Sequence, residues 1–170
     1  SGRNWSRPKA RIGRVSAPMR FENVHIEALG LALPQQVVTS TDLEGRLGPL
    51  YKRLGVSVGR LELMSGIKER RFWKPGTRPS DAAARAGKDA IERSGIDPAR
   101  IGCLIHSSVC RDFMEPATAS VVHARLGLSP ECEAFDLSNA CLGFANAVAL
   151  MASRIERGEL DAALVVSGED

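Results

Sequence analysis

Residues 136–146, DLSNACLGFAN, join two segments with different hydrophobic patterns. The residues before them, from Glu131, have the apolar content of a buried strand. Residues 141–160 show the spacing of a long helix that is apolar early and charged late. Strands that pass directly into helices are typical of proteins built on a parallel sheet. We therefore expect Cys141 at the carboxyl end of a strand and in the first turn of a helix.

The same alternation of strand and helix extends to both sides of this junction. Residues 100–110, RIGCLIHSSVC, form an apolar, β-branched run typical of a strand buried on both faces, and residues 161–170 predict another. One helix is expected between Ser80, a candidate N-cap, and Gly95, which can terminate it. A further helix is expected with Pro116 in its first turn.

The first third of the chain is less regular. Residues 21–33, FENVHIEALGLAL, alternate and then become continuously apolar, which predicts a strand followed by a loop. A helix capped by Ser40 or Thr41 should follow, with a break or bend at Gly48-Pro49, and residues 61–76 are expected to be loop with short strands. Buried strands alternating with helices predict an α/β layered fold with a mostly parallel sheet.

Composition restricts the class of protein. No apolar run approaches the roughly 18 residues that cross a bilayer, so no transmembrane segment is expected. The four cysteines, at positions 103, 110, 132 and 141, form no CxxC pair, and three of them lie in apolar runs. This usage favours reduced thiols and a cytoplasmic protein over a disulfide framework or a metal site.

Charge is concentrated at the N-terminus. The net charge is +3, but residues 1–18 hold five basic residues and no acidic ones, so the rest of the chain carries −2. We expect residues 1–19 to form a disordered basic tail, either a cloning remnant or a natural extension before Met19. The tail is the only feature that would favour a nucleic-acid partner, and none is expected.

Cys141 is a candidate nucleophile. A thiol at a helix N-terminus faces unpaired N–H groups and the positive end of the helix dipole, which favour the thiolate and lower its pKa. The backbone N–H of Cys141 could also hold an oxyanion. The alternative is ordinary packing, the interpretation that we give to Cys103 and Cys132 within strands. It applies less strongly to Cys110, which ends a strand.

Three motifs in the expected order resemble thiolase-fold condensing enzymes of the ketoacyl-acyl-carrier-protein synthase III group. They are SGIKERR at 65–71, RDFMEPATAS at 111–120 and FDLSNACLGFANAVALMASRIERGELDAALVVSGE at 135–169. The segments NACL and RDFMEP resemble most the OleA type, which joins two fatty acyl-CoA molecules head to head. The resemblance implies a thiolase-like layered fold, with a mostly parallel or mixed sheet of the five-layer type.

The resemblance covers only one half of such an enzyme. It implies that residues 20–170 are the N-terminal half of the fold, and that the catalytic His and Asn belong to a C-terminal half, in this protein or in another chain. His25 and His123 are expected to be packed or exposed, and His106 to be a hydrogen-bonded core residue. None of them matches the family's catalytic histidine. The resemblance also implies a homodimer.

Glu115 stands where synthase III enzymes usually have Phe, directly before Pro116. The resemblance to the OleA type implies that this carboxylate reaches across a dimer into the partner's site. A condensation without decarboxylation needs a base at the α-carbon, and a carboxylate in an apolar channel becomes a stronger base. The alternative is a solvated loop glutamate or a charge at a helix N-terminus.

These features together predict an acyltransferase that condenses two fatty acyl-CoA thioesters through an acyl-Cys141 intermediate, in olefin biosynthesis. One alternative is synthase III chemistry with malonyl-acyl-carrier protein, and another is a non-catalytic partner subunit that shapes a channel. No bound cofactor or metal is expected, because CoA thioesters are the substrates. The usual adenine-binding Trp and Arg align with Arg60 and Met64, so phosphate contacts are expected from Arg60, Lys68, Arg70 and Arg71, with a solvated basic loop as the alternative.

Overall fold

The computed structural model describes residues 18–169, so the sequence predictions for residues 1–17 lie outside the described part. The elements in chain order are β1 (Gln36–Thr39), α1 (Ser40–Arg46), α2 (Gly48–Leu54), α3 (Arg60–Ser65), β2 (Glu69–Phe72), α4 (Pro79–Ser94), the 3₁₀ turn η1 (Pro98–Arg100), β3 (Ile101–His106), α5 (Thr118–Leu126), β4 (Glu133–Asp136), the 3₁₀ turn η2 (Ala140–Leu142), α6 (Gly143–Glu156) and β5 (Ala162–Val166). None of the helices within these residues is long and apolar enough to span a membrane.

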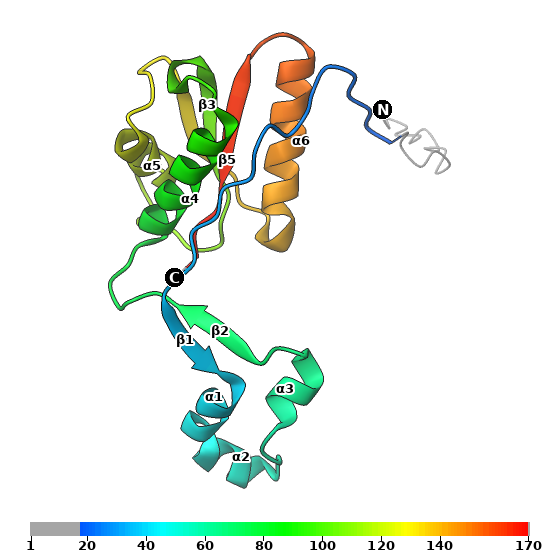
Figure 1. Ribbon diagram of the computed structural model, residues 1–170, viewed down its shortest axis with the longest axis vertical. Coiled ribbons are helices and arrows are strands. Elements are labelled where there is room, and N and C mark those ends of the chain that lie inside the picture. The colour runs from blue at the N-terminus through cyan, green and yellow to red at the C-terminus, as the bar shows by residue number, and fades with distance from the viewer. Residues whose placement is uncertain (1–17, 170) are drawn as a thin grey trace, which may run out of the picture.

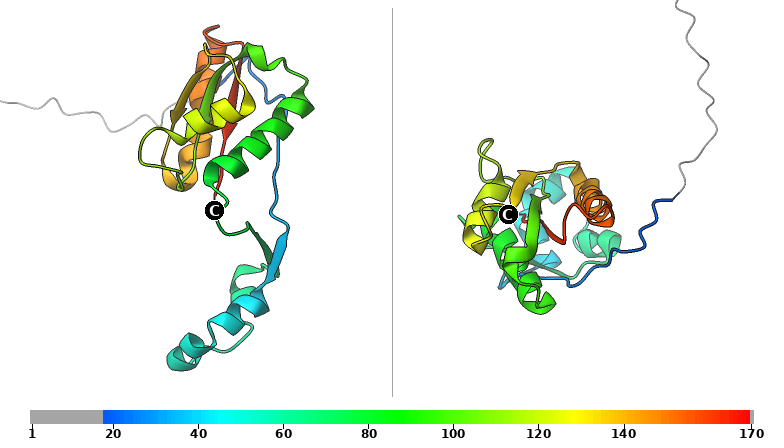
Figure 2. Two further views of the ribbon diagram at one scale, coloured as in Figure 1. Left: turned by 90° about the vertical axis from the view of Figure 1, so that its left-hand side faces the viewer. Right: turned by 90° about the horizontal axis from the view of Figure 1, so that it is seen from above.

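A parallel sheet with the strand order β4-β3-β5 forms the centre of the fold. Its two faces are covered by different helices, α4 and α5 on one side and α6 on the other (Figures 1 and 2). Alternate residues of β3 enter two separate apolar clusters: Leu104 packs with α4 and α5, whereas Cys103 and Ile105 pack with α6. The expected α/β layered fold with a parallel sheet is confirmed.

A smaller unit lies beyond the carboxyl end of this sheet (Figure 1). Its strands β1 and β2 pair antiparallel, and the short helices α1, α2 and α3 lie between them in the chain. Glu44 of α1 is buried here, and its carboxylate accepts the N–H groups of Gly59 at 2.6 Å and Leu61 at 2.7 Å. These bonds hold the start of α3 against α1 and lower the pKa of Glu44.

The predicted strand at 21–33 is wrong, because residues 18–34 contain no regular strand. Two of the segment's backbone N–H groups bond to helix side chains: that of Asn23 to Glu156 at 2.9 Å and that of Leu31 to Asp89 at 2.8 Å. Its apolar residues are largely exposed, with Leu29 at 73%. An alternating pattern predicts a strand only where a neighbouring strand supplies the ladder, and no ladder forms here.

The helix boundaries differ from expectation at three of the predicted starts. Thr39, and neither Ser40 nor Thr41, caps α1, because its hydroxyl accepts the N–H of Asp42 at 3.0 Å. The N-cap of α4 is Arg78, so the predicted cap Ser80 lies inside the helix. Helix α5 begins at Thr118, two residues after the predicted Pro116. The break at Gly48-Pro49 and the end of α4 at Gly95 are confirmed.

Candidate active site

Cys141 lies in the turn η2 between β4 and α6, and its side chain is exposed. The α-helix itself begins only at Gly143, so the predicted first-turn position is wrong by two residues. Ala140 has a φ of 44°, a left-handed conformation that is costly for a residue with a Cβ. A Cβ on Gly143 would lie 2.6 Å from the Oγ of Ser107, directly after β3. The turn that presents the thiol is therefore seated tightly on the end of β3.

The other cysteines have different environments. Cys103 and Cys132 are buried in the sheet region, which confirms their expected packing role. Burial raises the pKa of the Cys103 thiol to about 11 and also raises the pKa of Cys132. Cys110 is half-buried, and its backbone N–H lies 3.3 Å from the Glu169 carboxylate. Among the four, Cys141 alone has an exposed side chain.

Glu115 lies in the loop that connects β3 to α5, at the same carboxyl end of the sheet as Cys141. Its side chain is exposed, and its neighbours Met114 and Phe113 are 91% and 43% exposed. Within residues 18–169 no hydrogen bond joins Glu115 to the turn of Cys141. The loop thus presents a carboxylate beside exposed apolar side chains, and its exposure does not distinguish a base from a solvated loop glutamate.

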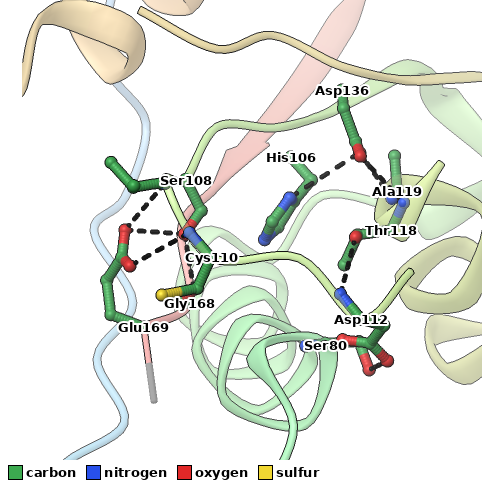
Figure 3. A network of polar contacts seen from close by, with 11 residues as sticks. Ser80, His106, Ser108, Cys110, Asp112, Thr118, Ala119, Asp136, Gly168 and Glu169 are labelled. Carbon is green, nitrogen blue, oxygen red and sulfur yellow. Dashed lines mark hydrogen bonds and ion pairs between the residues drawn. The ribbon is translucent and has the colours of Figure 1, made fainter. Parts of the chain in front are cut away.

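Three carboxylates, one of them within this loop, fix the loop to the rest of the fold (Figure 3). Asp136, the last residue of β4, accepts the N–H groups of Thr118 and Ala119 at 2.9 and 2.8 Å. Asp112 accepts the hydroxyl and the N–H of Ser80 at 2.5 and 2.9 Å. Each of these two carboxylates lies at the first turn of a helix. It accepts N–H groups that have no partner within the helix, and its negative charge interacts favourably with the positive end of the helix dipole.

Glu169 is the third anchor. Its carboxylate accepts the hydroxyl of Ser108 at 2.6 Å and the N–H of Val109 at 3.1 Å. Burial acts to raise the pKa of Glu169, but hydrogen bonds from Cys110 and Ser108 hold it below its usual value. The sequence interpretation did not identify Asp112, Asp136 or Glu169. An available signal was that each follows or ends a buried strand, where parallel sheets gather polar residues.

His106 is the last residue of β3, directly before this loop, and is only 1% exposed. Its Nδ1 lies 3.6 Å from Oδ1 of Asp136, and its Nε2 has no hydrogen-bond partner among the described residues. The expected burial is confirmed, but the expected full hydrogen bonding is not. Burial lowers the pKa of His106, and the positive charge of Arg111 lowers it further. The negative charges of Asp136, Asp112 and Glu169 act in the opposite direction but do not outweigh burial.

His106 should therefore make the fold less stable in mild acid. Because its folded pKa lies below the unfolded value of about 6.5, the unfolded chain binds a proton first as the pH falls. Stability should fall as the pH drops below that value and level off below the folded pKa. Replacing His106 by Asn should flatten this part of the curve, measured by urea unfolding of the full-length protein between pH 8 and 5. An unchanged slope in H106N would contradict the assignment.

The remaining predicted binding residues and histidines lie elsewhere. Arg60 and Lys68 are exposed, and two arginines on β2 are engaged: Arg70 donates to the Ser40 hydroxyl at 3.0 Å and Arg71 to the carbonyl of Pro34 at 3.5 Å. These residues belong to the smaller unit, and among residues 18–169 no hydrogen bond or ion pair joins them to the turn of Cys141. His25 is exposed, and His123 bonds the carbonyl of Ser129 at 2.9 Å. No group of three or more potential metal ligands gathers within residues 18–169.

The structure thus places an exposed cysteine in a turn at the carboxyl end of a parallel sheet. The chain belongs to the thiolase family: the thiolase N-terminal domain matches residues 69–170. It is 43% identical over 151 residues to an acyl-CoA:acyl-CoA alkyltransferase of Shewanella oneidensis, a match that covers 89% of this chain and 43% of that protein. A β-ketoacyl-[acyl-carrier-protein] synthase III of Symbiobacterium thermophilum is 36% identical, with 89% and 43% covered.

Solved structures give the same result. Cerulenin-bound OleA of Xanthomonas campestris superimposes with a TM-score of 0.84 at 42% identity, over 90% of this chain and 46% of that one. The predicted relationship to the synthase III group and to the OleA type is thus confirmed. The chain spans less than half the length of these relatives.

Proposed function

We propose that this chain is the part of an acyl-CoA:acyl-CoA condensing enzyme that carries its nucleophile. The observation that carries the proposal is the exposed Cys141 on a strained turn at the carboxyl end of the sheet, in a chain where Cys103 and Cys132 are buried. The 43% identity to an acyl-CoA:acyl-CoA alkyltransferase supports the same activity.

The chemistry has two steps. The Cys141 thiolate attacks the carbonyl carbon of one acyl-CoA and expels the CoA thiolate, which leaves the acyl group on sulfur. Glu115 then takes a proton from the α-carbon of a second acyl-CoA, and the resulting carbanion attacks the acyl-Cys141 carbonyl and expels the cysteine thiolate. The backbone N–H of Cys141 contributes to holding the oxyanion in both steps. The products are one β-ketoacyl-CoA and one free CoA.

The wider context belongs to the same proposal. Glu115 acts in the site of a partner protomer, so the enzyme works as a homodimer, and residues beyond this chain complete each site. CoA thioesters serve as substrates without a tightly bound cofactor, and Arg60, Lys68, Arg70 and Arg71 contact their phosphates. The enzyme functions in the cytoplasm, in olefin biosynthesis.

A mass measurement and a substrate comparison test the proposal. The full-length protein incubated with one long-chain acyl-CoA should gain one acyl mass on the peptide that contains Cys141 and should then release β-ketoacyl-CoA and CoA. The C141S variant should form neither thioester adduct nor product. Product formation only with malonyl-acyl-carrier protein would instead indicate synthase III chemistry, and the absence of any adduct would indicate a non-catalytic partner subunit.

A further inference from the structure

A single carboxylate joins the segment of Cys141 to the segment of Glu115. Asp136 ends β4, five residues before Cys141, and both of its oxygens are occupied by α5: Oδ2 accepts the N–H of Thr118 at 2.9 Å and Oδ1 that of Ala119 at 2.8 Å (Figure 3). Because these bonds fix two successive amides, they set both the position and the direction of the first turn of α5. These bonds therefore fix the start of α5 relative to β4, the strand that leads to Cys141.

Thr118 closes the loop that carries Glu115. Its hydroxyl accepts the N–H of Asp112 at 3.2 Å, and its side chain is fully buried. Asp112 is held in turn by Ser80 at the start of α4. Residues 113–117 therefore form a short tip between two anchored positions, and Thr118 takes part in both anchors through its N–H and its hydroxyl.

The tip is exposed, whereas its base is buried. Met114 and Glu115 are exposed, and only Pro116 and Ala117 separate Glu115 from the anchored Thr118. Proline fixes its own φ, which reduces the backbone freedom between the anchored Thr118 and Glu115. A proton transfer requires its base within hydrogen-bond reach of the proton, and a misplacement of about 1 Å can reduce a rate about a hundredfold.

We propose that Thr118 and Asp136 are positioning residues for Glu115, an inference that rests on the condensing activity proposed above. Neither side chain touches the substrate. Asp136 aligns α5 with the nucleophile's strand, and the Thr118 hydroxyl closes the 112–118 loop so that the carboxylate is presented in one place. Their loss should impair the step that needs the base and spare the step that does not.

Substitutions at Thr118 separate the two steps. In the full-length protein, T118V keeps the size of the side chain but removes the acceptor for the Asp112 N–H, and T118S retains that acceptor. T118V should lower the steady-state rate of β-ketoacyl-CoA formation roughly ten- to a hundredfold. The first-turnover release of CoA, which reports acylation of Cys141, should stay within about twofold of the parent. T118S should restore most of the condensation rate.

Asp136 provides a second variant with a matched control. D136N replaces one of the two acceptor oxygens by an N–H donor and should show the same selective loss of condensation. D97N makes the same carboxylate-to-amide change near the opposite end of β3, where one oxygen of Asp97 accepts the N–H of Ala99 at 2.9 Å, and should leave both rates unchanged. If T118V and D136N lose acylation and condensation equally, including through misfolding, the positioning role is overturned. It is also overturned if neither variant loses condensation. Failure of the parent protein to acylate Cys141 would instead overturn the proposed function.

Discussion

Replacing Glu115 by Gln is expected to abolish carbon–carbon bond formation in the full-length protein while acyl transfer to Cys141 continues. The amide has the size of the carboxylate but cannot accept a proton from the α-carbon of the second acyl-CoA. Removal of a general base lowers the rate of its step by about 10² to 10⁴. Formation of the acyl-enzyme needs no such base, so the acylated protein should accumulate and should be visible by intact mass.

The matched control is E131Q, which makes the same change at an exposed glutamate near the amino end of β4, the far end of the strand from Cys141. It should leave product formation unchanged. If E115Q forms β-ketoacyl-CoA at the parent rate, then Glu115 is a solvated loop residue, and the base must be sought elsewhere. Mixing E115Q with C141S subunits should restore activity if the carboxylate acts in its partner's site, because one site of a mixed dimer then receives both groups.

Replacing Gly168 by Ala should strongly destabilise the protein. A Cβ at this position would lie 2.1 Å from the carbonyl oxygen of Pro79 and 2.9 Å from the backbone nitrogen of Ala83. Both obstacles are backbone atoms of α4, so no side chain can rotate away, and the helix itself must shift. We expect the free energy of unfolding of the full-length protein to fall by about 3 kcal/mol, the upper end of the usual cost of overpacking.

Gly45 supplies the control for this substitution. It lies inside α1, and a Cβ there would meet nothing within 4 Å. Alanine favours the helix over glycine by about 0.5–1 kcal/mol, so G45A should stabilise the protein slightly. Urea unfolding of both variants should give changes of opposite sign. A midpoint for G168A equal to that of the parent would show that α4 is not held against the end of β5 as described.

Elements whose structure follows from their own local sequence were predicted well. The apolar, β-branched runs at β3 and β5 predict buried strands, and Gly95 ends α4 because a left-handed residue is needed there. The family relationship was also predicted from three motifs and is confirmed. The roles of Cys141 and Glu115 remain predictions, since the structure shows their exposure and their positions but no reacting partner.

Residues whose state depends on a distant partner were predicted poorly. The segment 21–33 has a strand-like pattern, but a strand requires a neighbour that supplies hydrogen bonds, and its N–H groups bond to Glu156 and Asp89 instead. Ser80 has the chemistry of an N-cap, but Arg78 takes that place, and the Ser80 hydroxyl bonds to Asp112 from another part of the chain. In both cases a contact between residues far apart in the sequence overrides the local preference.

The sequence by itself determined the order of strands and helices from α4 to β5, the burial of β3 and the position of Cys141 at the carboxyl end of a strand. Each of these follows from periodicity within one segment. Only the tertiary structure decided that Asp112, within the loop of Glu115, and Asp136 and Glu169, from other segments, fix this loop to the rest of the fold. No local sequence pattern shows which N–H donors a carboxylate will bind, because those N–H groups become its neighbours only after the sheet and its helices have packed.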